Sequence, residues 1–253
     1  MTNKFKLGIA FGGGGARGIA HLGCWKALLE NDLEPNIIAG TSAGALVGAF
    51  LCAGESPENI LNLFSEKGIF DFVKVRIPRK GLLELQGLED FLNAELGIKR
   101  IEDLPKPLII TASELTTAKV FYFQEGPLAK LLTASSCLPV LFAPVEIDGL
   151  MFVDGGLFDN IPVQPLESLC RSIIACNATP IGESNQLNNL VDITQRIFEL
   201  AANHCHSSAK AWLQIEYSAL CGKPLLDTRY AADAFKVGYE ATITALKSAR
   251  IPH

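Results

Sequence analysis

Short apolar runs separated by glycine turns open the chain and indicate alternating strands and helices. The run at residues 7–11 is typical of a buried strand, and a turn at 12–15 separates it from residues 18–30, whose apolar positions share one helix face. Residues 35–54 repeat the order of strand, glycine turn and helix. Two successive units of this kind predict an α/β fold with a largely parallel central sheet. Both glycine turns are then expected where the carboxyl ends of the strands meet helix N-termini.

The middle of the chain alternates short helices with strand-like runs. Helices are predicted at residues 87–96 and 128–135, and strands at residues 107–112, 119–123 and, as a pair around an Asp-Gly turn, 145–153. The strands at 107–112 and 119–123 either form a hairpin or lie as neighbours in the sheet. The Asp-Gly turn places Asp154 at the end of the strand that follows it.

The C-terminal part is predicted to contain one more core strand, at residues 172–176, and two long helices. The first helix is expected from 190 to about 217 and the second from 233 to 249. No repeat, low-complexity tract or flexible linker divides the sequence. With 253 residues, of which 49% are hydrophobic, residues 1–253 are expected to form a single domain with a sizeable core.

Composition and charge limit which partners and which cellular location are expected for this protein. The net charge of −5 argues against nucleic acid as a partner, because phosphate neutralisation needs an excess of Lys and Arg. The basic stretch at 74–80 favours a solvated loop, with contact to an anionic membrane surface as the alternative. The seven cysteines lack metal-ligand spacing, and neither a signal peptide nor a transmembrane helix is evident. A cytoplasmic protein is expected, with peripheral contact at the inner membrane face left open and the oligomeric state not predicted.

Candidate chemistry centres on Ser42 in Gly40-Thr41-Ser42-Ala43-Gly44, between an apolar strand and a helix of small residues. This is the layout of a nucleophile elbow. Such a turn holds the serine in a strained conformation at the top of a sheet, and the flanking glycines leave room for the backbone to approach closely. A serine alone is unreactive, so a base and an oxyanion hole must come from elsewhere in the chain.

The glycine loop Gly13-Gly14-Gly15-Ala16-Arg17-Gly18 is a candidate oxyanion hole. It formally matches a dinucleotide-binding loop, but no acidic residue stands at the end of the second strand to hold a ribose. It does not fit a phosphate-binding P-loop either, because Ile19 and Ala20 follow Gly18. Consecutive backbone N–H groups at a helix N-terminus can stabilise an oxyanion, and a tight packing turn is the structural alternative.

The histidines are poor candidates for the base. His253 is the last residue, while His204 and His206 lie two apart on a predicted helix and point to different sides, which also disfavours a shared metal. His21 follows the glycine loop and is expected to play a structural role. Asp154, at a strand end in Asp154-Gly155-Gly156, is the stronger candidate, because burial can raise the basicity of its carboxylate. A common Asp-Gly-Gly turn without catalytic work is the alternative.

These three segments together resemble the patatin-like phospholipase family, especially small bacterial members similar to the catalytic domain of neuropathy target esterase. That family's pattern runs from a G-G-G-x-R-G loop through a G-x-S-x-G elbow to an Asp-Gly-Gly or Asp-Gly-Ala base, which here are residues 13–18, 40–44 and 154–156. Residues 19–23, 134–139 and 159–163 also resemble the family. The resemblance extends from Lys6 to Asn177.

The resemblance implies a three-layer α/β/α sandwich and a lipid acyl hydrolase of the carboxylesterase type, without metal or other cofactor. Its expected substrates are phospholipids, lysophospholipids or other acyl esters. Carried over, Ser42 is the nucleophile, Asp154 is the proton acceptor, and the N–H groups of Gly13, Gly14 and Gly15 are the oxyanion donors.

Two positions and two functional alternatives stay open. Gly12 stands where relatives often carry Asp or Ser, and the match beyond residue 177 is only general. Arg17 either anchors the loop or meets a lipid phosphate, and the anchoring role is favoured. An acyltransferase on a similar fold is one alternative, disfavoured by the lack of a well-placed histidine. A weakly catalytic lipid-binding regulator is the other.

Overall fold

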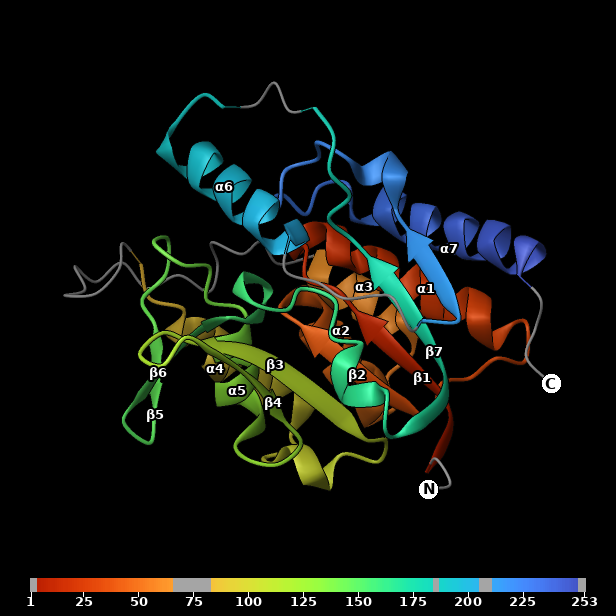
Figure 1. Ribbon diagram of the computed structural model, residues 1–253, viewed down its shortest axis with the longest axis horizontal. Helices are drawn as coiled ribbons and strands as arrows, with labels where there is room; N and C mark the ends of the chain where they lie inside the picture. The colour runs from red at the N-terminus through yellow and green to blue at the C-terminus, as the bar shows by residue number, and fades with distance from the viewer. Residues whose placement is uncertain (1–3, 66–82, 184–186, 205–210, 250–253) are drawn as a thin grey trace.

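The computed structural model describes residues 4–65, 83–183, 187–204 and 211–249. Within these residues, eight strands form one mixed sheet (Figure 1). The strands are β1 Phe5–Phe11, β2 Ile37–Thr41, β3 Leu108–Glu114, β4 Lys119–Phe123, β5 Val145–Ile147, β6 Leu150–Asp154, β7 Cys170–Asn177 and β8 Leu213–Glu216. Their order is β5-β6-β3-β2-β1-β7-β8, and β4 pairs with β3.

Helices connect these strands. The α-helices are α1 Ala20–Leu29, α2 Ala43–Ala53, α3 Pro57–Ser65, α4 Gln86–Leu96, α5 Leu128–Ser135, α6 Leu190–His204 and α7 Ala231–Ser248. Short 3₁₀ helices include η1 Gly15–Ile19, η3 Ile101–Asp103, η4 Gly155–Leu157, η5 Gln164–Leu166 and η6 Ser218–Leu220. Among the described helices, none combines the length and hydropathy needed to cross a bilayer.

The centre of the sheet is parallel, from β3 through β2, β1 and β7 to β8, and the strands β4, β5 and β6 run antiparallel to their partners. Alternate residues of each central strand face opposite cores. Ile9 and Phe11 join the core under α1, α2, α5 and α7, whereas Ala10 joins the core under residues 161–169 and η5. The predicted α/β fold with a largely parallel sheet is confirmed. The layer opposite α1, α2, α5 and α7 is thin, because it contains short 3₁₀ turns.

Most predicted elements occur where the pattern places them, with two refinements. The strands at 108–114 and 119–123 form an antiparallel hairpin, which resolves the alternative left by the sequence. The helix predicted from residue 18 begins instead as the 3₁₀ helix η1, because the glycine loop carries the backbone into a tighter turn before α1 starts at Ala20.

The helix predicted from 190 to about 217 is wrong over residues 213–216, and residues 205–210 lie outside the described part of the chain. Helix α6 ends at His204, and residues 213–216 form β8, which extends the sheet parallel to β7. Leu213 and Ile215 are buried while Gln214 and Glu216 are exposed, which is the two-residue alternation of an edge strand. A run of four residues is too short for this alternation to stand out against the helical pattern before it.

Candidate active site

Ser42 lies on a sharp turn between β2 and α2. Its backbone has φ 53° and ψ −123°, in a region that favours glycine. A Cβ on Gly40 would lie 2.6 Å from Ala45 Cα, and one on Gly44 would lie 2.2 Å from Phe11 O. The helix therefore packs directly against the strands, which is why both flanking positions are glycine.

The strained turn is held by hydrogen bonds on both sides of the serine. The Ser42 carbonyl accepts from the N–H of Ala45 at 2.9 Å, and its N–H donates to Ser135 Oγ at 2.9 Å. Ser135 Oγ in turn donates to Thr111 O at 2.7 Å. Helix α5 and strand β3 thus fix the backbone of Ser42, and its side-chain hydroxyl faces the cavity described below.

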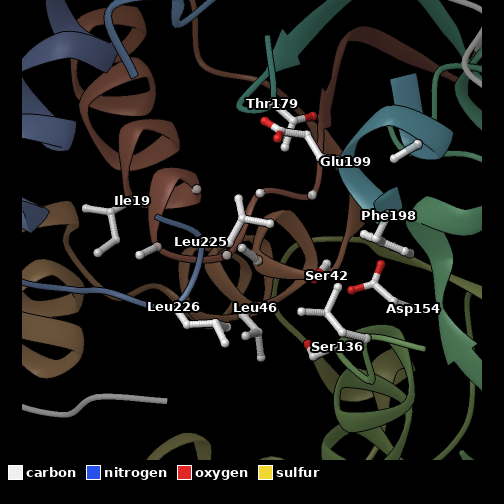
Figure 2. A pocket seen from close by; sticks show the side chains of 18 of the residues that line it. Ile19, Ser42, Leu46, Ser136, Asp154, Thr179, Phe198, Glu199, Leu225 and Leu226 are labelled. Carbon is white, nitrogen blue, oxygen red and sulfur yellow. The ribbon is translucent and has the colours of Figure 1, made fainter. Parts of the chain in front are cut away.

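The register of β3 brings Asp154 next to Ser42. Thr41, the last residue of β2, pairs with Thr111, and Asp154, the last residue of β6, pairs with Ala112 one position further along. Because β2 is parallel and β6 antiparallel to β3, the carboxyl ends of β2 and β6 meet on one edge of that strand. Figure 2 shows Ser42 and Asp154 side by side where these ends meet.

The Asp154 carboxylate is buried and half-satisfied. Its Oδ1 accepts from the N–H of Gly156 at 2.9 Å, whereas no donor among the described residues makes a hydrogen bond of ordinary geometry to Oδ2. Burial raises the pKa of Asp154 to about 7, against the lowering effects of the Ser42 hydroxyl and the Gly156 N–H. An aspartate with this pKa can accept a proton near neutral pH far better than an exposed one.

The glycine loop presents two free N–H groups to the same cavity. The N–H of Gly13 donates to Asn160 O at 3.2 Å, whereas those of Gly14 and Gly15 have no acceptor among the described residues. Gly15 adopts φ 54°, and a Cβ there would lie 2.1 Å from Leu225 O. Glycine is therefore required at this position, and Gly14 and Gly15 are better placed than Gly13 to donate to a bound oxyanion.

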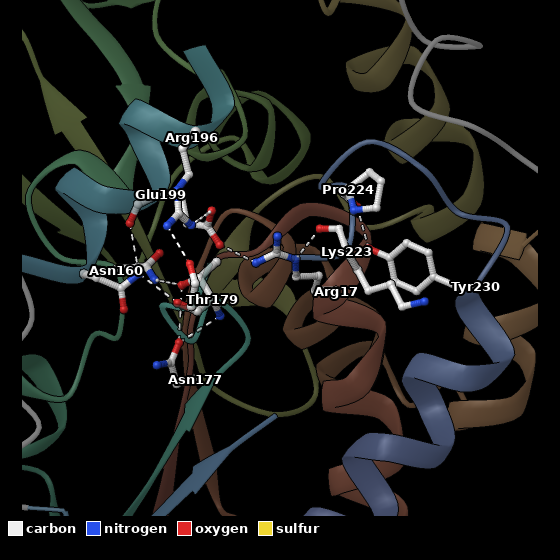
Figure 3. A network of polar contacts seen from close by, with 11 residues as sticks. Arg17, Asn160, Asn177, Thr179, Arg196, Glu199, Lys223, Pro224 and Tyr230 are labelled. Atoms are coloured by element: carbon white, nitrogen blue, oxygen red, sulfur yellow. Dashed lines mark hydrogen bonds and ion pairs between the residues drawn. The ribbon is translucent and has the colours of Figure 1, made fainter. Parts of the chain in front are cut away.

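Arg17 is buried and anchors the glycine loop. Its Nη1 lies 2.5 Å from Glu199 Oε1 on α6, and its Nε donates to Lys223 O at 2.7 Å (Figure 3). With its guanidinium engaged by these groups, Arg17 does not line the cavity. The geometry fits the anchoring role and offers no free cation there for a lipid phosphate.

His21 is buried behind the glycine loop rather than in the cavity. Its Nε2 lies 2.8 Å from Gly12 O and its Nδ1 lies 3.1 Å from the Tyr217 hydroxyl. Because a carbonyl only accepts, Nε2 carries the proton and Nδ1 accepts from the tyrosine. Burial lowers the pKa of His21 to about 4, so the ring is neutral at pH 7. The side chain of His204, together with His206, His253 and the basic stretch at 74–80, falls outside the described residues.

The His21→Ala variant is expected to lower the free energy of unfolding by about 3 kcal/mol, since it opens a cavity, leaves the Gly12 carbonyl buried without its donor and removes the ring nitrogen that accepts from the Tyr217 hydroxyl. Urea denaturation measures this change. His21→Gln, whose amide can still donate toward Gly12, should recover part of the loss. A change below about 0.5 kcal/mol in His21→Ala would contradict the structural role.

Ser42, Asp154 and the three loop glycines line one cavity of about 1040 Å³, a volume that includes part of its open mouth. Apart from the polar groups around Ser42, its walls are mainly apolar (Figure 2). The apolar lining comes from α2, α3, α4, α6 and two loops: Leu46, Val47, Phe64, Leu88, Leu138, Phe142, Phe198, Leu225 and Leu226. Within the part of the chain that the structure describes, no group of His, Cys, Asp and Glu is arranged to hold a metal ion.

Three further cavity residues, Asn160, Phe198 and Glu199, were not among the candidates from the sequence. Asn160 holds Gly13 through its carbonyl, and its side-chain amide donates to Thr179 Oγ1 at 2.9 Å. Phe198 and Glu199 come from α6, in the region where the resemblance is weakest. Asn160 lies in the family-like segment 159–163, which was the available signal, whereas α6 offered only its helical periodicity.

The fold and this arrangement define an α/β protein with a serine on a nucleophile elbow, beside a buried carboxylate and a glycine-rich loop. The chain belongs to the patatin-like phospholipase family, whose model matches residues 9–167.

Curated relatives share this domain within longer proteins. An uncharacterized NTE family protein of Mycobacterium tuberculosis is 31% identical over 211 residues, which are 78% of this chain and 59% of the relative. A patatin-like phospholipase domain-containing protein of Caenorhabditis elegans is 30% identical over 192 residues, which are 71% of this chain and 14% of that protein. The chain thus spans about three fifths of the mycobacterial relative.

Solved structures with a similar fold include two bacterial proteins. VipD from Legionella pneumophila matches with a TM-score of 0.55 and 16% identity, over 98% of this chain and 68% of VipD. The type III effector protein ExoU of Pseudomonas aeruginosa matches with a TM-score of 0.55 and 15% identity, over 97% of this chain and 53% of ExoU. These likenesses extend the shared fold beyond residue 167, where the family model ends.

Proposed function

We propose that this protein is a serine lipid acyl hydrolase, of the phospholipase or lysophospholipase type, that works with a Ser42–Asp154 dyad. The observation that carries the proposal is the meeting of Ser42, on a strained elbow, with the unpartnered Oδ2 of a buried carboxylate inside an apolar cavity. Membership of the patatin-like phospholipase family supports a lipid substrate.

In the first half of the reaction, Asp154 takes the proton of the Ser42 hydroxyl as Oγ attacks the ester carbonyl. The tetrahedral oxyanion accepts hydrogen bonds from the N–H groups of Gly14 and Gly15, which have no acceptor among the described residues. The bond from the carbonyl carbon to the leaving oxygen then breaks, and Asp154 returns the proton to the departing alcohol. An acyl group remains on Ser42.

In the second half, Asp154 takes a proton from water as the water oxygen attacks the acyl-serine. The same N–H groups stabilise the second oxyanion. The bond to Ser42 Oγ breaks, the serine regains its proton from Asp154, and a fatty acid leaves. No histidine is needed, because burial gives the carboxylate a pKa near neutrality, about 7.

The cavity lining supports an acyl chain as the bound group. Most side chains beyond the dyad are apolar, so burying an alkyl chain is favourable by about 0.8 kcal/mol per methylene, whereas a charged headgroup inside would meet few polar partners. The headgroup is therefore expected at the mouth.

Fluorophosphonate labelling, combined with a panel of acyl esters and lysophospholipids, tests the proposal. Labelling at Ser42 and release of free fatty acid support it, and turnover should persist in excess chelator. Transfer of the acyl group to an added alcohol or thiol in preference to water would identify an acyltransferase instead. Labelling without turnover on any ester would favour a lipid-binding regulator.

The pH profile of hydrolysis is expected to follow the ionisation of Asp154. Only the carboxylate form accepts a proton from Ser42, and burial raises the pKa of Asp154 to about 7. The kcat/KM for a soluble short-chain ester should therefore fall as pH decreases below 7 and reach a plateau above it. A profile that is flat from about pH 5 to about pH 9, roughly two pH units on either side of this pKa, would exclude Asp154 as the base.

A further inference from the structure

The outer face of α6 is apolar and exposed. Of the nine large apolar side chains that are exposed among the described residues, five lie in or just before this helix: Leu187, Leu190, Ile193, Ile197 and Leu200. The four within the helix recur every three or four positions, so they form one stripe. Leu190 and Ile197 are 66% and 63% exposed, which shows that the stripe faces solvent. We call these five residues the docking face.

The inner face of the same helix belongs to the candidate active site. Phe198 lines the cavity and packs on the turn after Asp154, since a Cβ on Gly156 would lie 3.1 Å from its Cζ. One residue further on, Glu199 is ion-paired with Arg17 of the glycine loop. Helix α6 therefore touches the turn that carries the base and the loop that carries the oxyanion donors.

Polar contacts attach α6 to the rest of the protein (Figure 3). Besides the Glu199 pair, Asn203 Nδ2 donates to Thr179 O at 2.7 Å and Arg196 Nη2 donates to Gly182 O at 2.7 Å. An ordinary surface helix buries its apolar stripe and exposes its polar one. In α6, Phe198 points inward, but the buried face also holds the charged Glu199, and four long aliphatic side chains stay exposed on the opposite face.

We propose that α6 docks the protein on a lipid surface through the docking face. The inference rests on the proposed function, because a lipid hydrolase must meet its substrate in an aggregate. The docking face carries no charge and no hydrogen-bonding side chain, so it matches the acyl region of a lipid layer better than a polar protein surface.

The position of α6 favours this partner over others. In Figure 1 the helix lies at the end of the sheet toward which the arrows of β1, β2 and β7 point, where the cavity is. The docking face and the cavity lie on opposite sides of one helix, so docking would bring a lipid layer to within about one helix diameter, ~10 Å, of the cavity.

Docking through this face depends on apolar insertion rather than on charge. The sequence has a net charge of −5, and Arg196, the cation beside the stripe, is paired with Glu199 at 2.9 Å. Binding to zwitterionic phosphatidylcholine vesicles should therefore be strong and nearly independent of salt. The ion pair to Arg17 also connects a docked α6 to the glycine loop, so vesicle substrates should turn over faster than the same ester in monomeric form.

Co-sedimentation with phosphatidylcholine vesicles tests the docking face. The triple variant Leu190→Ser, Ile193→Ser, Ile197→Ser should reduce the partition coefficient by about 100-fold or more, since three apolar side chains no longer insert. Its hydrolysis of a soluble short-chain ester should stay within about twofold of the wild type, because these side chains lie outside the cavity. The matched control Leu29→Ser, Leu115→Ser, which alters exposed leucines elsewhere, should bind vesicles normally.

The other outcomes are distinct. Unchanged vesicle binding by the triple variant would overturn the proposal, as would loss of soluble-ester turnover together with binding, which would mean that the stripe supports the fold. A wild-type dimer that the triple variant dissociates would assign the face to a second copy of the chain. Vesicle binding that depends on the docking face, in a protein that hydrolyses no ester, would remove the proposed function and leave the docking intact.

Discussion

Ser42→Ala is expected to lose ester hydrolysis by on the order of 10³-fold or more, because the attacking oxygen is gone and the remaining groups only bind and polarise the ester. Fluorophosphonate labelling should disappear with it. The measurement is the single-turnover release of fatty acid from a lysophospholipid and from a short-chain ester. Ser136→Ala is the matched control, since this serine also lines the cavity but donates its hydroxyl to Leu132 O at 2.9 Å.

A companion variant separates catalysis from folding. The φ of 53° at Ser42 strains every residue with a side chain, so Ser42→Gly should be as inactive as Ser42→Ala but more stable by about 1 kcal/mol. Denaturant unfolding compares the two. Activity retained in either variant would exclude Ser42 as the nucleophile, and equal stabilities would show that the elbow is not strained.

Asp154→Asn is expected to reduce hydrolysis by about 10²–10⁴-fold at pH 8, because an amide cannot accept the Ser42 proton. The amide oxygen can still accept from the Gly156 N–H, which Asp154 Oδ1 does at 2.9 Å, so the turn should keep its shape. Asp148→Asn, an exposed carboxylate in the turn before β6, is the control and should keep full activity. Near-normal turnover in Asp154→Asn would mean that another group is the base.

The same variant should be more stable than the wild type at high pH. Burial raises the folded-state pKa of Asp154 from 3.8 to about 7, so the folded state holds this proton where the unfolded state has lost it. The contribution of Asp154 to stability therefore falls as pH rises from about 4 to about 7. Above pH 7 the asparagine avoids this cost, by up to about 4 kcal/mol, and near pH 4 the advantage should vanish. If Asp154 is catalytic, Asp154→Asn should lose activity and gain stability above pH 7. If Asp154 is only structural, the variant should lose both.

Local patterns were sufficient for the elements that carry the candidate chemistry. The strand, turn and helix around Ser42 follow from short apolar runs and glycines, as does the hairpin of β5 and β6 that ends at Asp154. These features depend on residues within a few positions of one another, so sequence spacing determines them. Strand β8 was missed because only its pairing with β7 makes four residues, Leu213–Glu216, extended.

The distribution of donors in the glycine loop is less visible in the sequence. The sequence does not distinguish Gly13, Gly14 and Gly15. In the structure the Asn160 carbonyl accepts from the N–H of Gly13, and the N–H groups of the other two stay free. Likewise, Arg17 meets Glu199, 182 positions away, which no local pattern predicts. Both contacts arise from loops that the sheet brings together.

The sequence alone determines which reactive side chains are present and the kind of turn on which each lies. Tertiary structure decides that Ser42 and Asp154 meet, because strands β2 and β6 end against adjacent residues of β3, Thr111 and Ala112. It also decides the basicity of Asp154, since burial is a property of the folded chain and not of the residue. The outward apolar face of α6 has the same origin, because its periodicity marks a stripe but only packing shows which side of the helix is covered.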